Sequence, residues 1–272
     1  MAYPLVILHG WGASTKSYDK LKPLLEQKGI SVFVFDLPGF GNEPAPGEVW
    51  GVDNYADWVE KKIGEKIHSL LRQGYEGQAS PSFEPASLVI DSQLTRKESK
   101  KEGFILYGHS FGGRIAIKLA ARQMEGMKAL VLCDAAGVTP RPKSKITFFG
   151  LLSRSGKMVF SLPMLKYFQP LVRKIEYFLA GSRDYYYLQS EVMKGIFRKV
   201  IEEDLTSYLA KIKLPVLIVW GRKDKLTPVS DARILNEGIA GSLLEILEET
   251  GHSPHLERPE ELAVIIEKFI KK

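Results

Sequence analysis

The sequence has one cysteine, no long apolar run at its N-terminus, and no spacing of cysteine and histidine residues that is typical of a zinc site. The single cysteine, Cys133, cannot form a disulfide within the chain, and its place in the apolar run ALVLC favours a small buried hydrophobic residue over a reactive thiol. The N-terminal segment MAYPLVILHGWG lacks a basic region and a cleavage site, and its apolar run is too short for a signal peptide or a membrane span. These absences predict a cytoplasmic protein.

Nucleic-acid motifs are also missing, although the chain is basic. The formal net charge is +6, with 38 lysine and arginine residues against 32 aspartate and glutamate residues. There is no aromatic strand of the kind that stacks on RNA bases and no basic recognition helix, so we expect no nucleic-acid partner. The 272 residues, 44% of them hydrophobic, are enough for one large globular domain or two small ones with a full core.

Short apolar runs alternate along the chain with segments of helical pattern. Continuous apolar runs of this kind indicate parallel strands that are buried on both faces of a sheet. The sequence therefore predicts an α/β fold with a doubly wound, mostly parallel sheet. The expected strands are PLVIL (4–8), SVFVF (31–35), FILY (104–107), ALVLC (129–133), PVLIVW (215–220) and LLEIL (243–247).

The segments between these runs carry apolar stripes at helical spacing, which predicts helices that pack on the sheet. One of them begins near Asp53 and Asn54, either of which is a suitable N-cap, and the last has Pro259 in its first turn. The expected helices are SYDKLKPLLEQK (17–28), NYADWVEKKIGEKIHSLLRQ (54–73), GGRIAIKLAARQM (112–124), VSDARILNEGI (229–239) and PEELAVIIEKFIKK (259–272).

Two stretches interrupt the alternation of strands and helices. Residues 74–102 form a connection far longer than the ~2–6 residues usual in α/β units, and we expect a surface insertion there. Residues 137–205 are rich in apolar and aromatic residues divided by glycine and proline, which predicts several short helices that cap the edge of the sheet. The chain then divides into a core of residues 1–136 and 206–272 and a helical cap of residues 137–205.

The stretch YGHSFGG places a serine among glycines, directly after an apolar run and before a predicted helix. This Gly-x-Ser-x-Gly pattern, with Gly108 and Gly112 on either side of Ser110, is typical of a nucleophile elbow. Side chains two residues away from the serine would strike the backbone of such a tight turn, and glycine removes them. The sequence therefore predicts that Ser110 is held at the carboxyl edge of the sheet as a nucleophile.

A serine nucleophile needs a base, and the base needs an acid that orients it. Asp224 follows one predicted strand in VLIVWGRKDKLTP, and His252 follows the next in EETGHSPHLERPEE, which gives the chain order serine, aspartate, histidine. We expect Ser110, Asp224 and His252 to form a catalytic triad. Asp134, which follows the run LVLC, is the alternative acid.

These motifs make the chain similar to the serine esterases and lipases of the α/β-hydrolase superfamily. The resemblance covers nearly the whole chain, through HGWG, DLPGFG, GHSFGG, WGRKDKLTP and GHSPHLERPEE in that order. It implies that the backbone N–H groups of Trp11 and Phe111 form an oxyanion hole, in which losing one donor costs ~10²–10³ in rate. It also implies that no cofactor is needed.

The other four histidines compete with His252 for the role of the base. We expect His255 to cap or pack, and His68 to lie on a solvated helix face. No pair of histidines has convincing metal-ligand spacing with an open carboxylate, so we expect no metal site. The residues expected to line the substrate pocket are His9, His109, Phe148 and Phe149, and a structural role is the alternative for His9 and His109.

A serine at the elbow predicts hydrolysis of a carboxylic ester through an acyl-enzyme intermediate, with short to medium acyl chains. By resemblance, dehalogenases and epoxide hydrolases of the superfamily carry aspartate at this position. C–C bond hydrolases are an alternative, but they typically have asparagine before the serine and tryptophan after the base, where this chain has His109 and Ser253.

Two further alternatives concern the substrate and the class of protein. HGWG and DLPGFG are similar to the carboxylesterases that remove a methyl group from a pimeloyl-carrier-protein ester, which have tryptophan and leucine where this chain has His109 and Phe111. A non-catalytic ligand receptor of the same fold is the alternative from a different class.

The early position of PLVILHGWG leaves no room for the antiparallel strand pair that members of the family usually have before this strand. We therefore expect the apolar run SVFVF to form an edge strand, which a folded protein normally covers. The prediction is that the insertion around SLVIDSQL, or a second subunit of a homodimer, covers this edge. A monomer is the other expected state.

The expected cap is strongly basic. Between Gly137 and Ile175 it has eight basic residues and no acidic residue. Apolar residues among them would line an acyl pocket, while the basic side chains would lie at its rim. This charge predicts attraction of an anionic partner, either an acidic acyl carrier or a negatively charged lipid surface, and an ordinary solvated helix face is the alternative.

Overall fold

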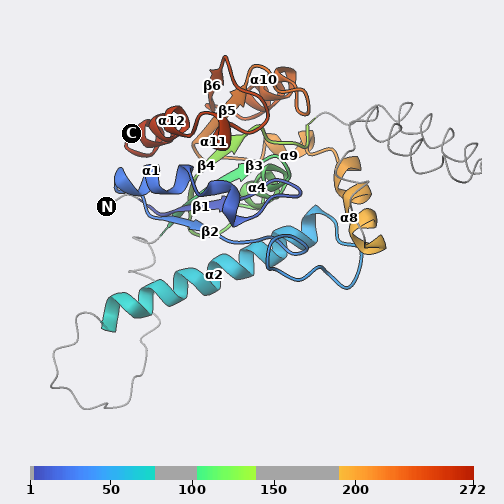
Figure 1. Ribbon diagram of the computed structural model, residues 1–272, viewed down its shortest axis with the longest axis horizontal. Coiled ribbons are helices and arrows are strands. Elements are labelled where there is room, and N and C mark those ends of the chain that lie inside the picture. The colour runs from blue at the N-terminus through green and yellow to red at the C-terminus, as the bar shows by residue number, and fades with distance from the viewer. Residues whose placement is uncertain (1–2, 77–102, 139–189) are drawn as a thin grey trace, which may run out of the picture.

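The computed structural model describes residues 3–76, 103–138 and 190–272 (Figure 1). Their strands form one six-stranded sheet in the order β2-β1-β3-β4-β5-β6, and all neighbouring pairs are parallel. The predicted α/β fold with a doubly wound, mostly parallel sheet is confirmed. The strands are β1 (Leu5–Leu8), β2 (Val32–Val34), β3 (Phe104–His109), β4 (Met127–Cys133), β5 (Val216–Gly221) and β6 (Leu243–Leu247).

The inner strands are largely apolar because both faces of the sheet are covered. Every residue of β1, β3 and β5 is buried. In β1, Val6 and Leu8 belong to one core cluster, while Leu5 and Ile7 belong to the other, as the alternation of side chains along a strand requires. The apolar runs identified in the sequence are therefore the strands of the sheet.

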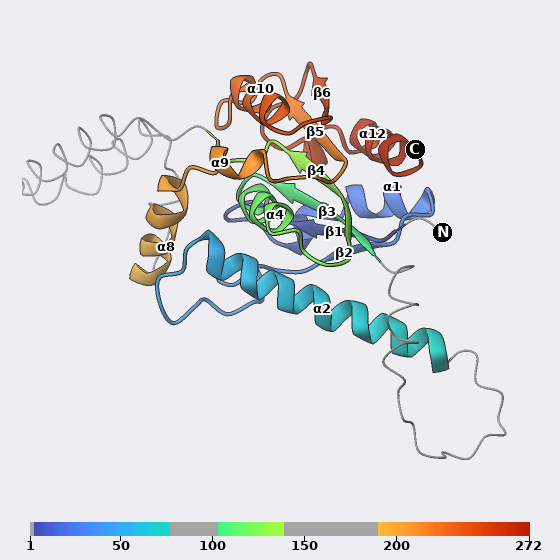
Figure 2. The same ribbon diagram turned by 180° about the vertical axis from the view of Figure 1, so that it is seen from behind.

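Each face of the sheet carries its own set of helices (Figures 1 and 2). The helices of one face contribute their buried apolar residues to the first core cluster, and those of the other face contribute to the second. The first set is α2 (Val52–Glu76), α4 (Phe111–Ala121), α9 (Thr206–Leu209) and α10 (Val229–Gly238), and the second is the 3-10 helix η1 (Thr15–Tyr18), α1 (Leu21–Gln27) and α12 (Pro259–Ile270).

The first predicted helix is divided in two. Residues 17–28 contain the end of η1 and then α1, which begins at Leu21. Pro23 thereby lies in the first turn of α1, where an N–H group would have no intrahelical partner. The proline therefore allows a helix that begins at Leu21 and disfavours one that begins several residues earlier.

Helix α2 begins earlier and ends later than the sequence predicted. Its first residue is Val52, so neither Asp53 nor Asn54 is the N-cap. Asn54 occupies the third helical position, and its side-chain oxygen accepts a hydrogen bond from the N–H of Gly51 at 2.9 Å, the contact that the third residue of a capping box makes. The helix continues to Glu76, so the first three residues of the expected insertion are helical.

The described chain has a parallel edge strand. Strand β2 pairs only with β1 among the described residues, which confirms the predicted edge position of residues 31–35. The segment around SLVIDSQL that was expected to cover this edge lies outside the described residues. Of the expected cap, α8 (Glu191–Glu202) is described, and residues 139–189 are not. Within the described ranges, no helix is long and apolar enough to cross a membrane.

Candidate active site

Ser110 lies at the turn between β3 and α4, in a backbone conformation that few residues adopt. Its φ is 50° and its ψ is −111°. This geometry carries a steric cost of order 1–3 kcal/mol, which the surrounding structure must overcome. The turn is held by the backbone of Ser110, whose N–H donates to the carbonyl of Cys133 at 3.3 Å and whose carbonyl accepts from the N–H of Ala136 at 3.1 Å.

The glycines around Ser110 are required by close contact with backbone. A Cβ on Gly112 would lie 2.2 Å from the carbonyl oxygen of Leu8 on the neighbouring strand. A Cβ on Gly108 would lie 2.6 Å from the carbonyl oxygen of Gly112 across the turn. Because backbone atoms cannot move aside as a flexible side chain can, only glycine lets α4 start this close to the sheet.

Ser110, His252 and Asp224 are brought together at the carboxyl ends of three different strands. The Oγ of Ser110 lies 3.0 Å from Nε2 of His252. The Nδ1 of the same ring lies 2.7 Å from Oδ2 of Asp224. The three residues follow β3, β6 and β5, and the parallel sheet puts those ends at one edge. The geometry is that of a hydroxyl, a base and an orienting carboxylate in series.

The carboxylate of Asp224 is fully buried and fully hydrogen-bonded. Its Oδ1 accepts from the N–H groups of Leu226 at 2.7 Å and Thr227 at 3.1 Å, and its Oδ2 accepts from the hydroxyl of Thr227 at 2.6 Å as well as from His252. Burial alone would raise the pKa of Asp224, but the hydrogen bonds from His252, Thr227 and the backbone of Leu226 hold this pKa below its ordinary value. Asp224 is therefore an anion at neutral pH.

Asp134, the alternative acid, is also buried but differs from Asp224 in charge. Its Oδ1 accepts a hydrogen bond from the N–H of Gly221 at 2.9 Å. Burial raises the pKa of Asp134 to about 9, with further contributions from the nearby charge of Asp224 and a side-chain hydrogen bond to it. A carboxyl group that is neutral at pH 7 cannot stabilise an imidazolium as an anion does, so the geometry and charge favour Asp224 as the partner of His252.

One atom each from Asp134, Asp224 and His252 lie within 4.8 Å of one another, a spacing that a metal ion could bridge. Two of these residues, however, are hydrogen-bonded to each other, with His252 Nδ1 at 2.7 Å from Asp224 Oδ2. The third is the neutral Asp134, whose protonated form is a poor metal ligand. The donor set fits a hydrogen-bonded triad better than a metal site.

A cavity of about 490 Å³ opens on Ser110 and His252. Its size is within the range of ligand pockets in proteins. Apolar side chains make up much of the wall, and the charged residues Arg114 and Asp231 also line it. The larger apolar lining residues are Trp11, Phe111, Phe197, Val200, Ile201, Leu226 and Leu256.

Trp11 and Phe111, the two expected oxyanion donors, both line this cavity. The N–H of Phe111 belongs to the first turn of α4, where backbone donors have no intrahelical partner. The loop that contains Trp11 passes close to the nucleophile, since a Cβ on Gly10 would lie 3.3 Å from Cβ of Ser110. The Trp11 ring packs edge-on against Phe40, Phe111 and Phe197, with centroid distances of 4.8, 5.2 and 5.0 Å.

His9 does not line the cavity, which corrects its expected place in the pocket. Its ring is fully buried, its Nδ1 lies 2.8 Å from the carbonyl oxygen of Gly10, and its Nε2 accepts from the N–H of Leu37 at 2.9 Å. Burial lowers the pKa of His9. The physical reason for the correction is that both ring nitrogens are occupied: Nδ1 bonds the carbonyl of the next residue, and Nε2 joins the loop after β1 to the loop after β2.

The remaining predicted residues fall into three groups. His109 lines the cavity, as expected. His255 packs, as expected, with its ring stacked on Tyr18 at 4.6 Å, and it also contributes to the cavity wall. Phe148 and Phe149 lie outside the described residues. His68 lies in α2, as the sequence predicted.

Sequence reasoning missed several residues of the site, among them Thr227 and Phe197. Thr227 follows the acid by three residues and precedes a proline, so the pattern Asp-x-x-Thr-Pro was an available signal for a turn in which the hydroxyl returns to the carboxylate. Phe197 lies on α8 and reaches the cavity. Its helical periodicity indicates a buried face but not which cavity that face meets, so no signal in the sequence identified it.

Comparison with known proteins gives one family. The sequence pattern of the family described as alpha/beta hydrolase fold matches residues 3–259. A pimeloyl-[acyl-carrier protein] methyl ester esterase from Aeromonas hydrophila is 24% identical, over 98% of this chain and 94% of the relative. Lipase 1 from Psychrobacter immobilis is 24% identical, over 96% of this chain and 74% of the relative.

A solved structure has the same fold. The esterase EaEST from Exiguobacterium antarcticum superposes with a TM-score of 0.65 and 24% sequence identity, and the match covers 100% of this chain and 94% of that structure. At this level of identity the match speaks for the fold alone.

Proposed function

Because the chain belongs to the α/β-hydrolase family, we propose that it is a serine hydrolase that cleaves carboxylic esters through an acyl-enzyme intermediate. The observation that carries the proposal is the chain of contacts from Ser110 Oγ through both nitrogens of His252 to Asp224, at 3.0 and 2.7 Å. A ligand-sized cavity opens on these groups. They supply the nucleophile, base and orienting acid of acyl transfer.

Acylation begins when Ser110 Oγ attacks the ester carbonyl and His252 takes the hydroxyl proton on Nε2. The Nδ1–H of His252 donates to Asp224, which keeps the lone pair of Nε2 directed at Ser110 and stabilises the imidazolium. The tetrahedral intermediate collapses as the imidazolium gives the proton to the alcohol leaving group. Ser110 is then acylated and His252 is neutral again.

Deacylation repeats the same proton transfers with water. His252 takes a proton from the water as the water oxygen attacks the acyl carbon, and the second tetrahedral intermediate breaks its bond to Ser110. The proton returns to the Oγ of Ser110, and the carboxylic acid leaves. No metal or cofactor takes part in the proposed cycle.

The negative oxygen of both tetrahedral intermediates would accept hydrogen bonds from the N–H groups of Trp11 and Phe111. Phe111 supports this role because its amide lies at the N-terminus of α4, where the helix dipole also favours negative charge. Trp11 supports it because its loop passes over the nucleophile and its ring packs on Phe111. Donors fixed in this way need little reorganisation during the reaction.

For the substrate we propose a small ester with a short to medium acyl chain. The cavity of about 490 Å³ has room for such a group, and its apolar wall favours an acyl chain over a polar one. The carrier-protein methyl ester esterase among the relatives supports an anionic carrier-linked ester as a second candidate. The basic segment that would attract an acidic carrier or a lipid surface lies almost wholly outside the described residues.

Two other functions of this fold have less support. Hydrolysis of a C–C bond is disfavoured by His109 and Ser253, which stand where those enzymes typically have asparagine and tryptophan. A non-catalytic receptor would have no use for a hydroxyl 3.0 Å from a base that is itself paired with a buried carboxylate. The cap over residues 137–205, a monomeric or homodimeric state and a cytoplasmic location remain predictions.

The test uses a panel of p-nitrophenyl esters from acetate to palmitate, together with a fluorophosphonate that labels active serines. We expect turnover to be greatest for short and medium chains and to fall by about 10⁴-fold or more in Ser110→Ala. Covalent label should be found on Ser110 alone, with the melting temperature of the variant close to that of the parent. Turnover that survives Ser110→Ala would overturn the proposal, as would a lack of turnover on every ester.

A further inference from the structure

His109 lies beside the base in space and directly precedes the nucleophile in sequence. It is the last residue of β3, and only 5% of its surface is exposed. Its ring centroid lies 5.0 Å from that of His252 and 4.6 Å from that of His255. The side chain is therefore packed against the loop that carries the base and contributes to the wall of the same cavity.

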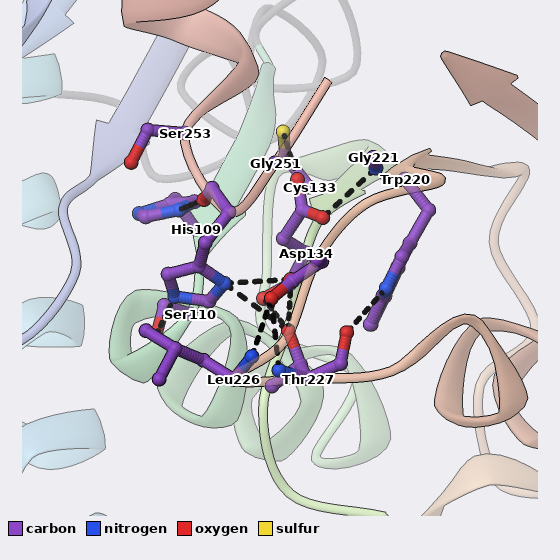
Figure 3. A network of polar contacts seen from close by, with 12 residues as sticks. His109, Ser110, Cys133, Asp134, Trp220, Gly221, Leu226, Thr227, Gly251 and Ser253 are labelled. Carbon is purple, nitrogen blue, oxygen red and sulfur yellow. Dashed lines mark hydrogen bonds and ion pairs between the residues drawn. The ribbon is translucent and has the colours of Figure 1, made fainter. Parts of the chain in front are cut away.

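The hydrogen bond of His109 goes to the main chain of the base. Its Nε2 lies 2.7 Å from the carbonyl oxygen of His252 (Figure 3). A carbonyl oxygen can only accept, so Nε2 of His109 must carry a proton and donate it. This contact fixes the Nε2–H tautomer and leaves the lone pair on Nδ1, which is buried and has no hydrogen-bond partner among the described residues.

The environment of His109 keeps its ring neutral. Burial lowers the pKa of His109 well below its ordinary value, and the neighbouring His255 and His252 lower it further. A neutral ring with a single proton on Nε2 has one donor, and the carbonyl of His252 uses it. Among the described residues, Gly10 is the close neighbour of Nδ1, since a Cβ on Gly10 would lie 2.8 Å from that atom.

Other hydrogen bonds hold the loop on either side of the base. The carboxylate of Glu257 accepts from the N–H of Gly251 at 2.8 Å and from the N–H of Ser253 at 3.0 Å. These contacts lie on either side of His252 and are exposed to solvent. The partly buried contact from His109 holds the carbonyl of His252 between them, so it constrains the peptide plane next to the Cα from which the base projects.

We propose that His109 is a positioning residue for the reaction, whose Nε2–H fixes the main chain of His252 so that the imidazole stays in line between Ser110 and Asp224. The inference rests on the proposed serine hydrolase function. Displacement of a catalytic group by about 1 Å can cost about 10²-fold in rate. Loss of the hydrogen bond that sets its position can therefore lower kcat by more than the bond's contribution to folding stability suggests. The same packing with no role in positioning is the competing explanation.

The test compares two amide side chains that differ in where they place a donor. Glutamine can put an N–H near the position of Nε2, whereas asparagine is shorter and puts its amide near the position of Nδ1. We expect His109→Gln to keep kcat within about threefold of the parent and His109→Asn to lower kcat by about 10- to 100-fold. KM should agree within about twofold between the two variants, because both replace the same part of the cavity wall by an amide.

Two further measurements separate positioning from folding. The melting temperatures of the Gln and Asn variants should agree, and the second-order rate of fluorophosphonate labelling of Ser110 should fall with kcat in the Asn variant alone. In the parent, nitrogen NMR of labelled histidine should find the Nε2–H tautomer of His109 between pH 5 and pH 8. A ring that is protonated or carries its proton on Nδ1 in this range would contradict the proposal.

Other outcomes bear on the proposal in a defined way. If the Gln and Asn variants have equal kcat, the hydrogen bond does not position the base, and the proposal is overturned. If both lose activity together with their melting temperature, His109 serves the fold alone, and the proposal is overturned as well. Loss of activity in Ser110→Ala keeps the serine hydrolase function in place in either case, so the two failures are distinguishable.

Discussion

The hydroxyl of Thr227 lies 2.6 Å from Oδ2 of Asp224, the same carboxylate oxygen that accepts from the imidazole of His252. It is also 3.3 Å from the carbonyl oxygen of Asp134. The hydroxyl has one proton, and the short contact to the anionic carboxylate is the stronger one. Thr227 therefore stabilises Asp224 as an anion and holds it facing the base.

The first prediction follows from this contact. Thr227→Val keeps the shape of the side chain but removes the donor, so we expect kcat/KM for a p-nitrophenyl ester to fall by about tenfold. Thr227→Ser retains the hydroxyl and serves as the matched control, with activity within about threefold of the parent. Equal activities of the Val and Ser variants would show that the hydroxyl does not act on Asp224.

The second prediction concerns which carboxyl group serves the base. Asp224→Asn removes the anion that pairs with His252 and should lower kcat by about 10³–10⁴-fold. Asp134→Asn replaces a carboxyl group that is already neutral, so its kcat should stay within about tenfold of the parent. The measurement is kcat for both variants at pH 7. A larger loss in Asp134→Asn than in Asp224→Asn would exchange the two roles.

The third prediction concerns stability against pH. The pKa of Asp134 is about 9 in the folded state and about 3.9 in an unfolded chain, so the folded state holds the proton more tightly. The stability that this group contributes is fully present below the unfolded pKa and is lost as pH rises toward the folded pKa. We therefore expect the free energy of unfolding of Asp134→Asn, relative to the parent, to rise between pH 5 and pH 8 by about 1 kcal/mol per pH unit.

Urea unfolding at several pH values checks this prediction, because titrations common to parent and variant cancel in the difference. Asp224 has the opposite sign, since its pKa is lowered in the folded state and its contribution is lost as pH falls. The relative stability of Asp224→Asn should therefore decrease as pH rises from about 3 to about 5. A relative stability of Asp134→Asn that does not depend on pH would mean that Asp134 is ionised in the fold.

The fourth prediction uses two glycines as a matched pair. Gly112→Ala would place a Cβ 2.2 Å from the carbonyl oxygen of Leu8, so we expect a loss of more than about 3 kcal/mol in the free energy of unfolding, or no folded protein. Gly64 lies in α2, is exposed and has nothing within 4 Å of an added Cβ. Gly64→Ala should increase the free energy of unfolding by about 0.5–1 kcal/mol. A tolerated alanine at position 112 would contradict the close approach of α4 to β1.

The strands, the principal sheet-packing helices and the elbow could be predicted from the sequence because their causes are local. A strand buried on both faces is apolar at every position, as in β5, and a tight turn between strand and helix needs glycine on each side of Ser110. The motifs and their order along the chain named Ser110, Asp224 and His252, which the structure brings together, but left Asp134 as an alternative acid. Errors were confined to places where a neighbour decides, such as the start of α2 at Val52.

Only the tertiary structure decided between residues of the same kind. Asp134 and Asp224 both follow buried strands, and the contact of Asp224 with His252 and Thr227 distinguishes them. His9 and His109 both stand beside glycine-rich loops. His9, however, joins the loops after β1 and β2, whereas His109 contacts the main chain of the base. These outcomes depend on which strand ends are neighbours and on how deeply each side chain is buried. Residues more than 140 positions apart, such as Ser110 and His252, meet only when the sheet has formed, so no local pattern contains their distance, hydrogen bonds or charge.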